Sequence, residues 1–135
     1  MLYTITTMTN EELMQLAKEV SKNAYVQYSH FPVGACILTE SGKVYKGCNF
    51  ENSSYGLTIC AERNATGSAI ADGEKSFKAI AIYSPKMKRC FPCGACRQVL
   101  SEFQIKDGLD VILEDENDKL VVFKLNEIFP EGFKL

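Results

Sequence analysis

Two short cysteine-containing segments, about thirty residues apart, constrain the fold of this chain more than any other feature. The first places Cys60 two residues before Glu62, and the second is the Cys93-x-x-Cys96 pair. Together they offer three thiolates to a tetrahedral cation, leaving the fourth position free and a carboxylate nearby that need not be a ligand. A structural zinc site would be closed by a fourth protein ligand, and the single histidine, His30, lies far upstream without ligand spacing. The pattern therefore predicts a catalytic site with one zinc ion per chain.

Helix geometry explains how these ligands can meet. Cys93 and Cys96 are three residues apart, so in the first turn of a helix both side chains lie on one face and can chelate one ion. Cys60 and Glu62 would diverge in mid-helix, but a Cys60 with non-helical dihedrals at a helix N-terminus lets both approach a site on the helix axis. Backbone N–H groups and the positive dipole ends of both helices would favour ionised thiols. We therefore expect both segments to begin helices.

The rest of the chain alternates between helical and extended patterns, which predicts an α/β fold. Thr9 and Glu12 form a capping box that opens an amphipathic helix running to Ala24. Glu40-Ser41-Gly42 joins two strands into a hairpin, and a charged turn favours antiparallel pairing of the last two strands. The other expected elements are strands over 33–39, 43–47, 79–83, 110–113 and 120–123 and helices over 60–71 and from Cys93 to near Phe103.

The length of the chain limits its organisation. With 135 residues, 46% of them hydrophobic, it can bury one core but has no room for a second. We therefore expect a single domain spanning residues 1–135, in which helices cover both faces of one sheet.

Four segments resemble the zinc-dependent cytidine deaminases in their order and approximate spacing. They are Phe31-Pro32-Val33-Gly34-Ala35, Gly47-Cys48-Asn49-Phe50-Glu51-Asn52, Cys60-Ala61-Glu62-Arg63 and Pro92-Cys93-Gly94-Ala95-Cys96-Arg97-Gln98. Zinc deaminases share a signature of H-x-E followed by P-C-x-x-C, and Cys60 replaces the histidine here, which points to the nucleoside branch with three thiolate ligands. The resemblance, from roughly Asn10 to Phe133, implies a three-layer sandwich of helices, a mixed five-stranded sheet and helices.

The resemblance also implies an activity. It implies zinc-dependent hydrolysis of cytidine and deoxycytidine to uridine, deoxyuridine and ammonia, in pyrimidine salvage, by a homotetramer. Cys60, Cys93 and Cys96 would hold the zinc. Glu62 would carry protons between a water, N3 of the base and the departing amine, which requires a raised pKa in a closed apolar pocket. Arg63 would offset the charge of the thiolates by hydrogen bonding to their sulfurs, although an ordinary surface arginine would give the same sequence.

The residues expected to contact substrate come from several segments. The resemblance implies that Asn49 and Glu51 hold a ribose hydroxyl and that the backbone of Ala61 contacts the base. Phe31 can supply a face for the pyrimidine. Phe133 resembles the C-terminal aromatic residue that reaches the base in a neighbouring subunit. The alternatives are turn chemistry for the asparagine and glutamate and core packing for the two phenylalanines.

Charge and hydropathy exclude several classes of partner. The net charge is −2 with both signs interspersed, so the chain lacks the basic stripe that a nucleic acid polymer would require. No run approaches the ~18 apolar residues of a membrane span, and the Met1–Thr7 stretch lacks the basic and apolar regions of an export signal. We therefore expect a cytoplasmic protein whose six cysteines are reduced.

Other assignments of the cysteines remain open at this stage. Cys90, Cys93 and Cys96 match the opening of a ferredoxin-type iron–sulfur run, although no cysteine follows three residues later. A thioredoxin-like Cys93-x-x-Cys96 pair would leave Cys60 and Glu62 without a purpose. Cys36 and Cys48 are expected to be buried small apolar residues.

Two further functions would preserve the zinc-binding cysteines. A deaminase of another aminated heterocycle, such as blasticidin S, would not need the ribose contacts, and a non-catalytic zinc-binding module would not need Glu62. The basic Lys86, Lys88 and Arg89 cluster could contact a substrate phosphate if its loop covers the pocket, but a solvated loop is the simpler expectation.

Overall fold

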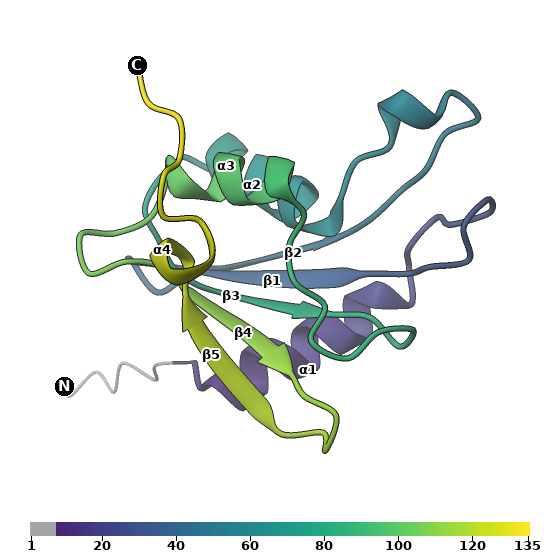
Figure 1. Ribbon diagram of the computed structural model, residues 1–135, viewed down its shortest axis with the longest axis horizontal. Helices are drawn as coiled ribbons and strands as arrows, with labels where there is room; N and C mark the ends of the chain where they lie inside the picture. Colours follow the sequence, from purple (N-terminus) through teal and green to yellow (C-terminus); the bar gives the residue numbers. More distant parts are fainter. Residues whose placement is uncertain (1–7) are drawn as a thin grey trace, which may run out of the picture.

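A mixed five-stranded sheet forms the centre of the molecule (Figure 1). The structure is a computed structural model that describes residues 8–135. The strand order is β2-β1-β3-β4-β5, in which β3 and β4 are parallel and the other neighbours antiparallel. In chain order the elements are α1 (Asn10–Ser21), β1 (Gly34–Thr39), β2 (Val44–Cys48), the 3₁₀ helix η1 (Tyr55–Leu57), α2 (Ala61–Ala71), β3 (Phe77–Tyr83), α3 (Gly94–Ser101), β4 (Asp110–Glu114), β5 (Leu120–Lys124) and α4 (Leu125–Ile128).

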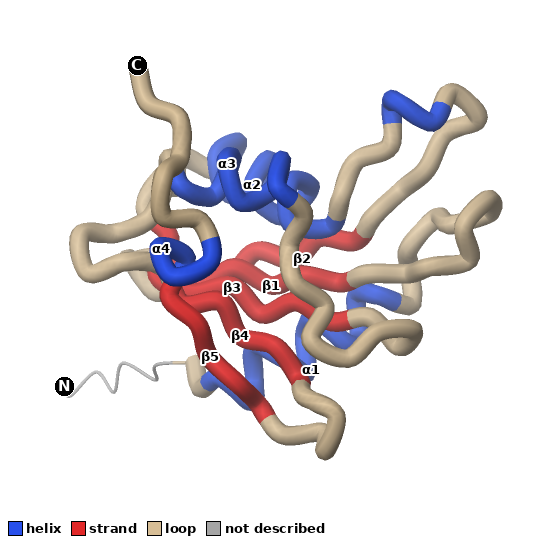
Figure 2. Tube along the Cα trace, viewed as in Figure 1, coloured by secondary structure: helices blue, strands red, loops and turns tan. Residues whose placement is uncertain are grey.

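Helices cover both faces of this sheet, which confirms the expected three-layer fold (Figure 2). Helix α1 packs on one face through Leu13, Met14 and Ala17, and α2 packs on the other through its alanines. Each face therefore has its own apolar cluster. Strand β1 is buried along its whole length because both of its faces are covered.

The ends of the helices follow local capping chemistry. Thr9 and Glu12 make the expected capping box, in which each backbone N–H donates to the other residue's side chain, at 3.2 and 3.1 Å. Helix α1 ends at Ser21, earlier than the apolar pattern predicts. The reason lies in the next residues, because the Tyr25 N–H donates to the Asn49 carbonyl at 3.0 Å and holds the chain against a different segment.

Two strand glycines allow the helices to lie close to the sheet. A Cβ at Gly34 would lie 2.0 Å from the Ala17 carbonyl oxygen of α1, and one at Gly47 would lie 2.4 Å from the Ala65 nitrogen of α2. Backbone atoms cannot move aside as a flexible side chain can. The approach at Gly47 therefore fixes the position of α2, whose N-terminus carries Cys60.

We expect Gly47→Ala to destabilise the protein by about 1 to 3 kcal/mol or more, because the added methyl forces α2 away from β2. Urea unfolding of both proteins measures the change. Gly56→Ala is the matched control, since a Cβ there would meet no atom within 4 Å. An unchanged unfolding midpoint for Gly47→Ala would show that α2 can shift without cost.

Two expectations concern membranes and export. Within residues 8–135, none of the helices has the length and apolar character needed to cross a bilayer. The expectation that there is no export signal concerns Met1–Thr7, which lies outside the described residues.

Candidate active site

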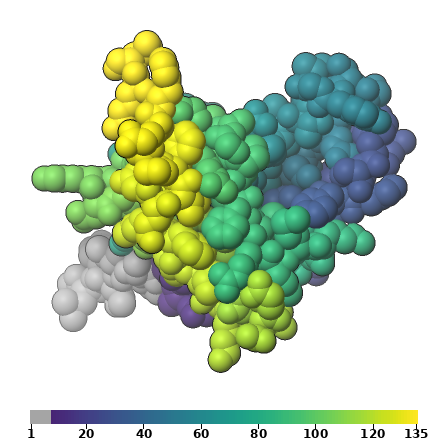
Figure 3. All heavy atoms as spheres, in the orientation of Figure 1, coloured from purple at the N-terminus to yellow at the C-terminus, as the bar shows by residue number. Residues whose placement is uncertain are grey.

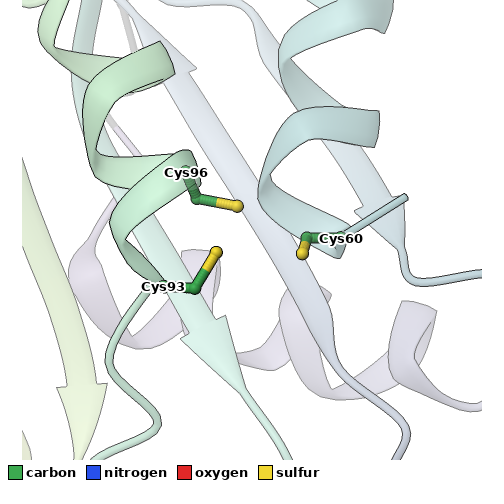
Figure 4. A group of neighbouring side chains, drawn as sticks. All are labelled: Cys60, Cys93 and Cys96. Atoms are coloured by element: carbon green, nitrogen blue, oxygen red, sulfur yellow. The ribbon is translucent and has the colours of Figure 1, made fainter. Parts of the chain in front are cut away.

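The two cysteine segments meet where α2 and α3 begin (Figure 4). Cys60 is the N-cap of α2 and Cys93 the N-cap of α3, both with extended backbone dihedrals, and Cys96 lies in the first turn of α3. Neither cap side chain is engaged in a capping hydrogen bond, so both sulfurs are available to a ligand. Figure 4 shows the three side chains pointing into the space between the two helices.

The three thiols fit a tetrahedral zinc ion. Their sulfur atoms all lie within 4.8 Å of one another. The edge of a tetrahedron with ~2.3 Å zinc–sulfur bonds is about 3.8 Å, so a small inward movement of the side chains would complete the coordination. Soft thiolates are ligands that zinc prefers, and the described residues offer no fourth protein ligand to this cluster. The geometry is that of an open site.

Cys90 does not belong to this cluster. It is 8% exposed, and burial raises the pKa of its thiol to about 11. The ferredoxin-type reading would require Cys90 as a ligand beside Cys93 and Cys96. In the structure the sulfur atoms of Cys93 and Cys96 lie close to that of Cys60 instead.

Hydrogen bonds and charge distinguish the thiols from one another. The pKa of Cys60 is lowered to about 5, chiefly by a hydrogen bond from Cys96 and also by Arg63, whose Nη2 donates to the Cys60 sulfur at 3.3 Å. The pKa of Cys96 is raised because it keeps its proton in that hydrogen bond and is buried. A cation bound by all three sulfurs would favour their ionised forms together. Arg63 is partly buried against the thiols rather than exposed on the surface.

Glu62 lies next to the thiols and is 5% exposed. Burial is the main cause that raises the pKa of its carboxyl to about 7, from an ordinary value near 4.5. A carboxyl with such a pKa can both accept and donate a proton near neutral pH. This is the property that the expected proton carrier requires.

A cavity of about 240 Å³ opens beside Glu62 and the thiols. It contains three of the expected substrate-contacting residues, namely Phe31, Asn49 and Ala61. The Asn49 side chain accepts from the Val33 N–H and donates to the Phe31 carbonyl, both at 2.9 Å, so it also fixes the segment that carries Phe31. The complete lining is Phe31, Val33, Asn49, Thr58, Cys60, Ala61, Glu62, Met87, Cys90, Phe91 and Cys93.

Glu51 does not line this cavity. It lines a neighbouring one of about 320 Å³, which shares Thr58 with the first. Its Oε1 accepts the N–H groups of Tyr28 and Ser29 at 3.0 and 3.1 Å, and hydrogen bonds from Ser29 are the main cause that lowers its pKa. Figure 3 shows the 49–59 arm that carries Glu51 standing out from the body at the upper right.

Phe133 also lies outside the cavity, on the C-terminal segment. It is 68% exposed, and its backbone N–H and carbonyl pair with the side-chain amide of Gln98, both at 3.0 Å. The ring is therefore held at the surface and does not pack in the core. Cys36 is buried as expected, whereas Cys48, expected to be buried, is only partly so because it ends the edge strand β2.

Some lining residues were not identified from the sequence. Met87, Cys90 and Phe91 belong to the loop between β3 and α3 and form one wall of the cavity. Phe91 stands two residues before Cys93, and this proximity was the available signal. Met87 carried none, because its position depends on how the loop folds back.

Known proteins place the chain in a family. The family model for the cytidine and deoxycytidylate deaminase zinc-binding region matches residues 7–109, most of the chain. The chain belongs to this deaminase family. A cytidine deaminase from Sporosarcina psychrophila is 51% identical over 96 residues, 71% of each chain. The crystal structure of cytidine deaminase from Burkholderia pseudomallei superimposes with a TM-score of 0.85 at 43% identity, covering 93% of this chain and 100% of that one.

One relative of this chain has a different named activity. A blasticidin-S deaminase from Bacillus cereus is 33% identical over 127 residues, 88% of each chain. Membership in the deaminase family, together with the zinc-binding region, argues against the electron-carrier and thioredoxin-like assignments of the cysteines. The cytidine deaminase from Sporosarcina psychrophila is more similar to this chain than the blasticidin-S deaminase is, so the blasticidin-type alternative is not favoured.

Proposed function

We propose that this protein is a zinc-dependent cytidine deaminase, which hydrolyses cytidine and deoxycytidine to the corresponding uridines and ammonia. The observation that carries the proposal is the burial of Glu62 beside three converging thiols at the wall of a cavity. A non-catalytic zinc module would have no use for a buried carboxyl with a raised pKa at that position. The named activity of the Sporosarcina and Burkholderia proteins supports the same reaction.

The residues divide the chemistry between them. Cys60, Cys93 and Cys96 would hold the zinc, which would supply Lewis-acid chemistry to a water. Glu62 takes one proton from the attacking water and delivers it to N3 of the pyrimidine, then takes the second proton from the hydroxyl group left on C4 and delivers it to the amino group, which leaves as ammonia. Arg63 withdraws charge from the Cys60 sulfur through its hydrogen bond.

The substrate fits between two walls of the cavity. Phe31 offers a ring face to the pyrimidine. Ala61 is buried in the wall of the cavity and offers its backbone groups to the base. Asn49 lies in the same cavity and is assigned to the sugar. Glu51 is assigned to the sugar from the adjoining cavity, which a substrate would reach across Thr58.

A nucleoside suits this pocket better than its 5′-phosphate. The segment from Gly47 to Ile59 has no basic residue to replace the hydration of a phosphate, and it carries the Glu51 carboxylate. Two members of the nearby basic cluster are already paired: Lys88 with Glu114 and Asp118, and Arg89 with Glu116. A dianion would have to compete with these carboxylates.

An assay at fixed ionic strength tests the proposal. We expect cytidine and deoxycytidine to lose the cytosine absorbance and give uridine and deoxyuridine, with kcat/KM for deoxycytidine about 100-fold or more above that for its 5′-monophosphate. A higher value for the nucleotide would move the protein to the nucleotide deaminases and assign a phosphate to the Lys86–Arg89 loop. Turnover of blasticidin S without turnover of cytidine would instead favour the other named activity.

The cellular setting follows from the same assignment. We place the reaction in pyrimidine salvage, in the cytoplasm, by one domain spanning residues 1–135. All six cysteines are free thiols, which fits a reducing compartment.

A homotetramer is part of the proposal, with pockets completed by neighbouring subunits. Phe133 is exposed and lies outside its own chain's cavity, so its ring is available to a neighbour. Large apolar side chains are also exposed on the 49–59 arm and on the segment between α1 and β1, as expected of an interface between copies. They are Tyr25, Tyr28, Phe50, Tyr55 and Leu57.

A further inference from the structure

The loop that forms one wall of the cavity, residues 84–92, is held mainly from outside the site. It joins β3 to α3 and carries Met87, Cys90 and Phe91. Its internal hydrogen bonds are few: the bridge between Ser84 and Met87, one from the Lys86 N–H to the Ser84 hydroxyl at 3.2 Å, and one from the Phe91 N–H to the Arg89 carbonyl at 2.8 Å. Such a loop needs an anchor if its side chains are to keep one position.

Glu114 supplies that anchor from the end of β4. Its carboxylate is 7% exposed and pairs with the Lys88 ammonium at 2.9 Å and with Lys18 of α1 at 2.6 Å. Its carbonyl accepts the Arg89 N–H at 2.8 Å. One residue therefore binds two consecutive loop residues, while Lys18 fixes the carboxylate to a helix on the other side of the sheet.

The acidic turn that follows β4 adds two more contacts. Lys88 also pairs with Asp118, and the Arg89 guanidinium pairs with Glu116 at 3.0 Å. These partners are exposed, so water screens both pairs and each contributes little alone. The Glu114 carboxylate is different, because it is buried, and without its lysines it would be a charge left without a partner away from water.

The metal-binding end of the loop has a separate support. Arg97 donates from Nε to the Pro92 carbonyl and from Nη1 to the Ile128 carbonyl, both at 2.7 Å, and its N–H donates to the Cys93 carbonyl at 3.0 Å. These bonds hold the residues next to the thiol without using Glu114. Loss of the Glu114 anchor should therefore loosen the cavity wall and leave the cysteine cluster in place.

We propose that Glu114 is a positioning residue for substrate binding, which acts through Lys88 and the 84–92 loop on the cavity wall formed by Met87, Cys90 and Phe91. The expected effect of Glu114 on cytidine binding rests on the proposed function. The effect of Glu114 on the position of the 84–92 loop does not depend on which reaction the protein catalyses.

Two variants test the anchor from its two ends, Glu114→Gln and Lys88→Met. We expect each to raise KM for cytidine and Kd for the product uridine about tenfold, with kcat within about twofold and one zinc per chain retained. Because the two residues act as one unit, the double variant should be no worse than the more affected single variant. Calorimetry measures uridine binding, and elemental analysis measures zinc.

A second measurement reports on the wall directly. Cys90 is almost buried in this loop, so its alkylation by iodoacetamide in the zinc-loaded protein, followed residue by residue with mass spectrometry, measures how often the wall opens. We expect the rate at Cys90 to rise about tenfold in both variants. This readout remains valid if cytidine is not the substrate.

Two controls separate positioning from simple stability. Asp110→Asn removes the 2.7 Å ion pair between Asp110, at the start of β4, and Lys124, at the end of β5. It should change neither KM for cytidine nor the rate of Cys90 alkylation. Lys18→Met removes only the helix side of the Glu114 pairing and should lower the melting temperature with KM unchanged.

The outcomes are distinguishable. If the parent enzyme turns over cytidine but KM, uridine binding and Cys90 alkylation in Glu114→Gln and Lys88→Met stay within twofold of the parent, Glu114 has only a structural role. If the parent does not turn over cytidine, the proposed function fails, and the alkylation rates alone decide the anchor. Should Glu114→Gln not fold, Lys88→Met carries the test, because Lys88 is partly exposed.

Discussion

Glu62→Gln is expected to lower kcat by on the order of 10³- to 10⁴-fold while the protein keeps its fold and its zinc. The glutamine side chain has the same shape and can still fill the buried position, which is 5% exposed. It cannot accept a proton from water or deliver one to N3 and the leaving amine. Since every proton transfer in the proposed reaction uses this one carboxyl, the substitution removes all of them together.

The measurement is the steady-state rate with cytidine, alongside zinc content and thermal unfolding. Glu102→Gln, on an exposed residue at the C-terminal end of α3, is the matched control and should have the parent's kcat. A Glu62→Gln protein with full zinc and a near-normal rate would remove Glu62 from the proton-carrying role. Loss of zinc would instead make Glu62 a ligand and close the coordination shell.

Local sequence signals were sufficient to predict the layers of the fold. The capping box at Thr9 and Glu12, the turn around Gly42 and the two cysteine helix starts each depend on residues within a few positions of one another. The spacing of apolar residues then predicted which segments are helices and which are strands. Element ends were less predictable, because α1 stops where Tyr25 pairs with a segment far along the chain.

In the site, too, features set by neighbouring residues could be predicted, whereas contacts between distant segments could not. Cys60, Cys93 and Cys96 could be grouped from spacing and helix geometry, and the structure brings their sulfurs together. The separation of Glu51 from the cavity that contains Asn49 could not be foreseen, because it depends on hydrogen bonds to the distant 28–29 backbone. The resemblance implied that both contact a ribose hydroxyl, but not that two adjoining cavities divide them.

The basic cluster before Cys90 illustrates what sequence alone could not decide. From the sequence, Lys88 and Arg89 could contact a phosphate if their loop covered the pocket, although a solvated loop was the simpler expectation. Their carboxylate partners lie about 26 to 30 residues later in the chain. Only the folded chain brings Glu114, Glu116 and Asp118 to the loop. The ion pairs that argue against phosphate binding are also those that anchor the wall of the cavity.

Removing one zinc ligand should have the second large effect. Cys96→Ala is expected to abolish turnover and to leave almost no zinc after dialysis against a chelator. Structural zinc sites bind with about 10 to 16 kcal/mol, so loss of one of three thiolates should weaken binding by roughly a third of that, or on the order of 10² to 10⁴-fold in affinity. Elemental analysis of the dialysed protein measures the loss directly.

Cysteine substitutions at other positions provide the controls for this prediction. Cys90→Ala changes a neighbouring buried thiol outside the cluster, and Cys48→Ala changes a partly buried one on β2, so both should retain one zinc per chain. The Cys90 variant is the more demanding control, because an iron–sulfur run would need that residue. Zinc loss from Cys90→Ala, or full zinc in Cys96→Ala, would contradict the ligand set. Because Cys96 is fully buried, the thermal unfolding of Cys96→Ala is compared with that of the parent stripped of zinc, so that the lost metal is separated from the lost packing.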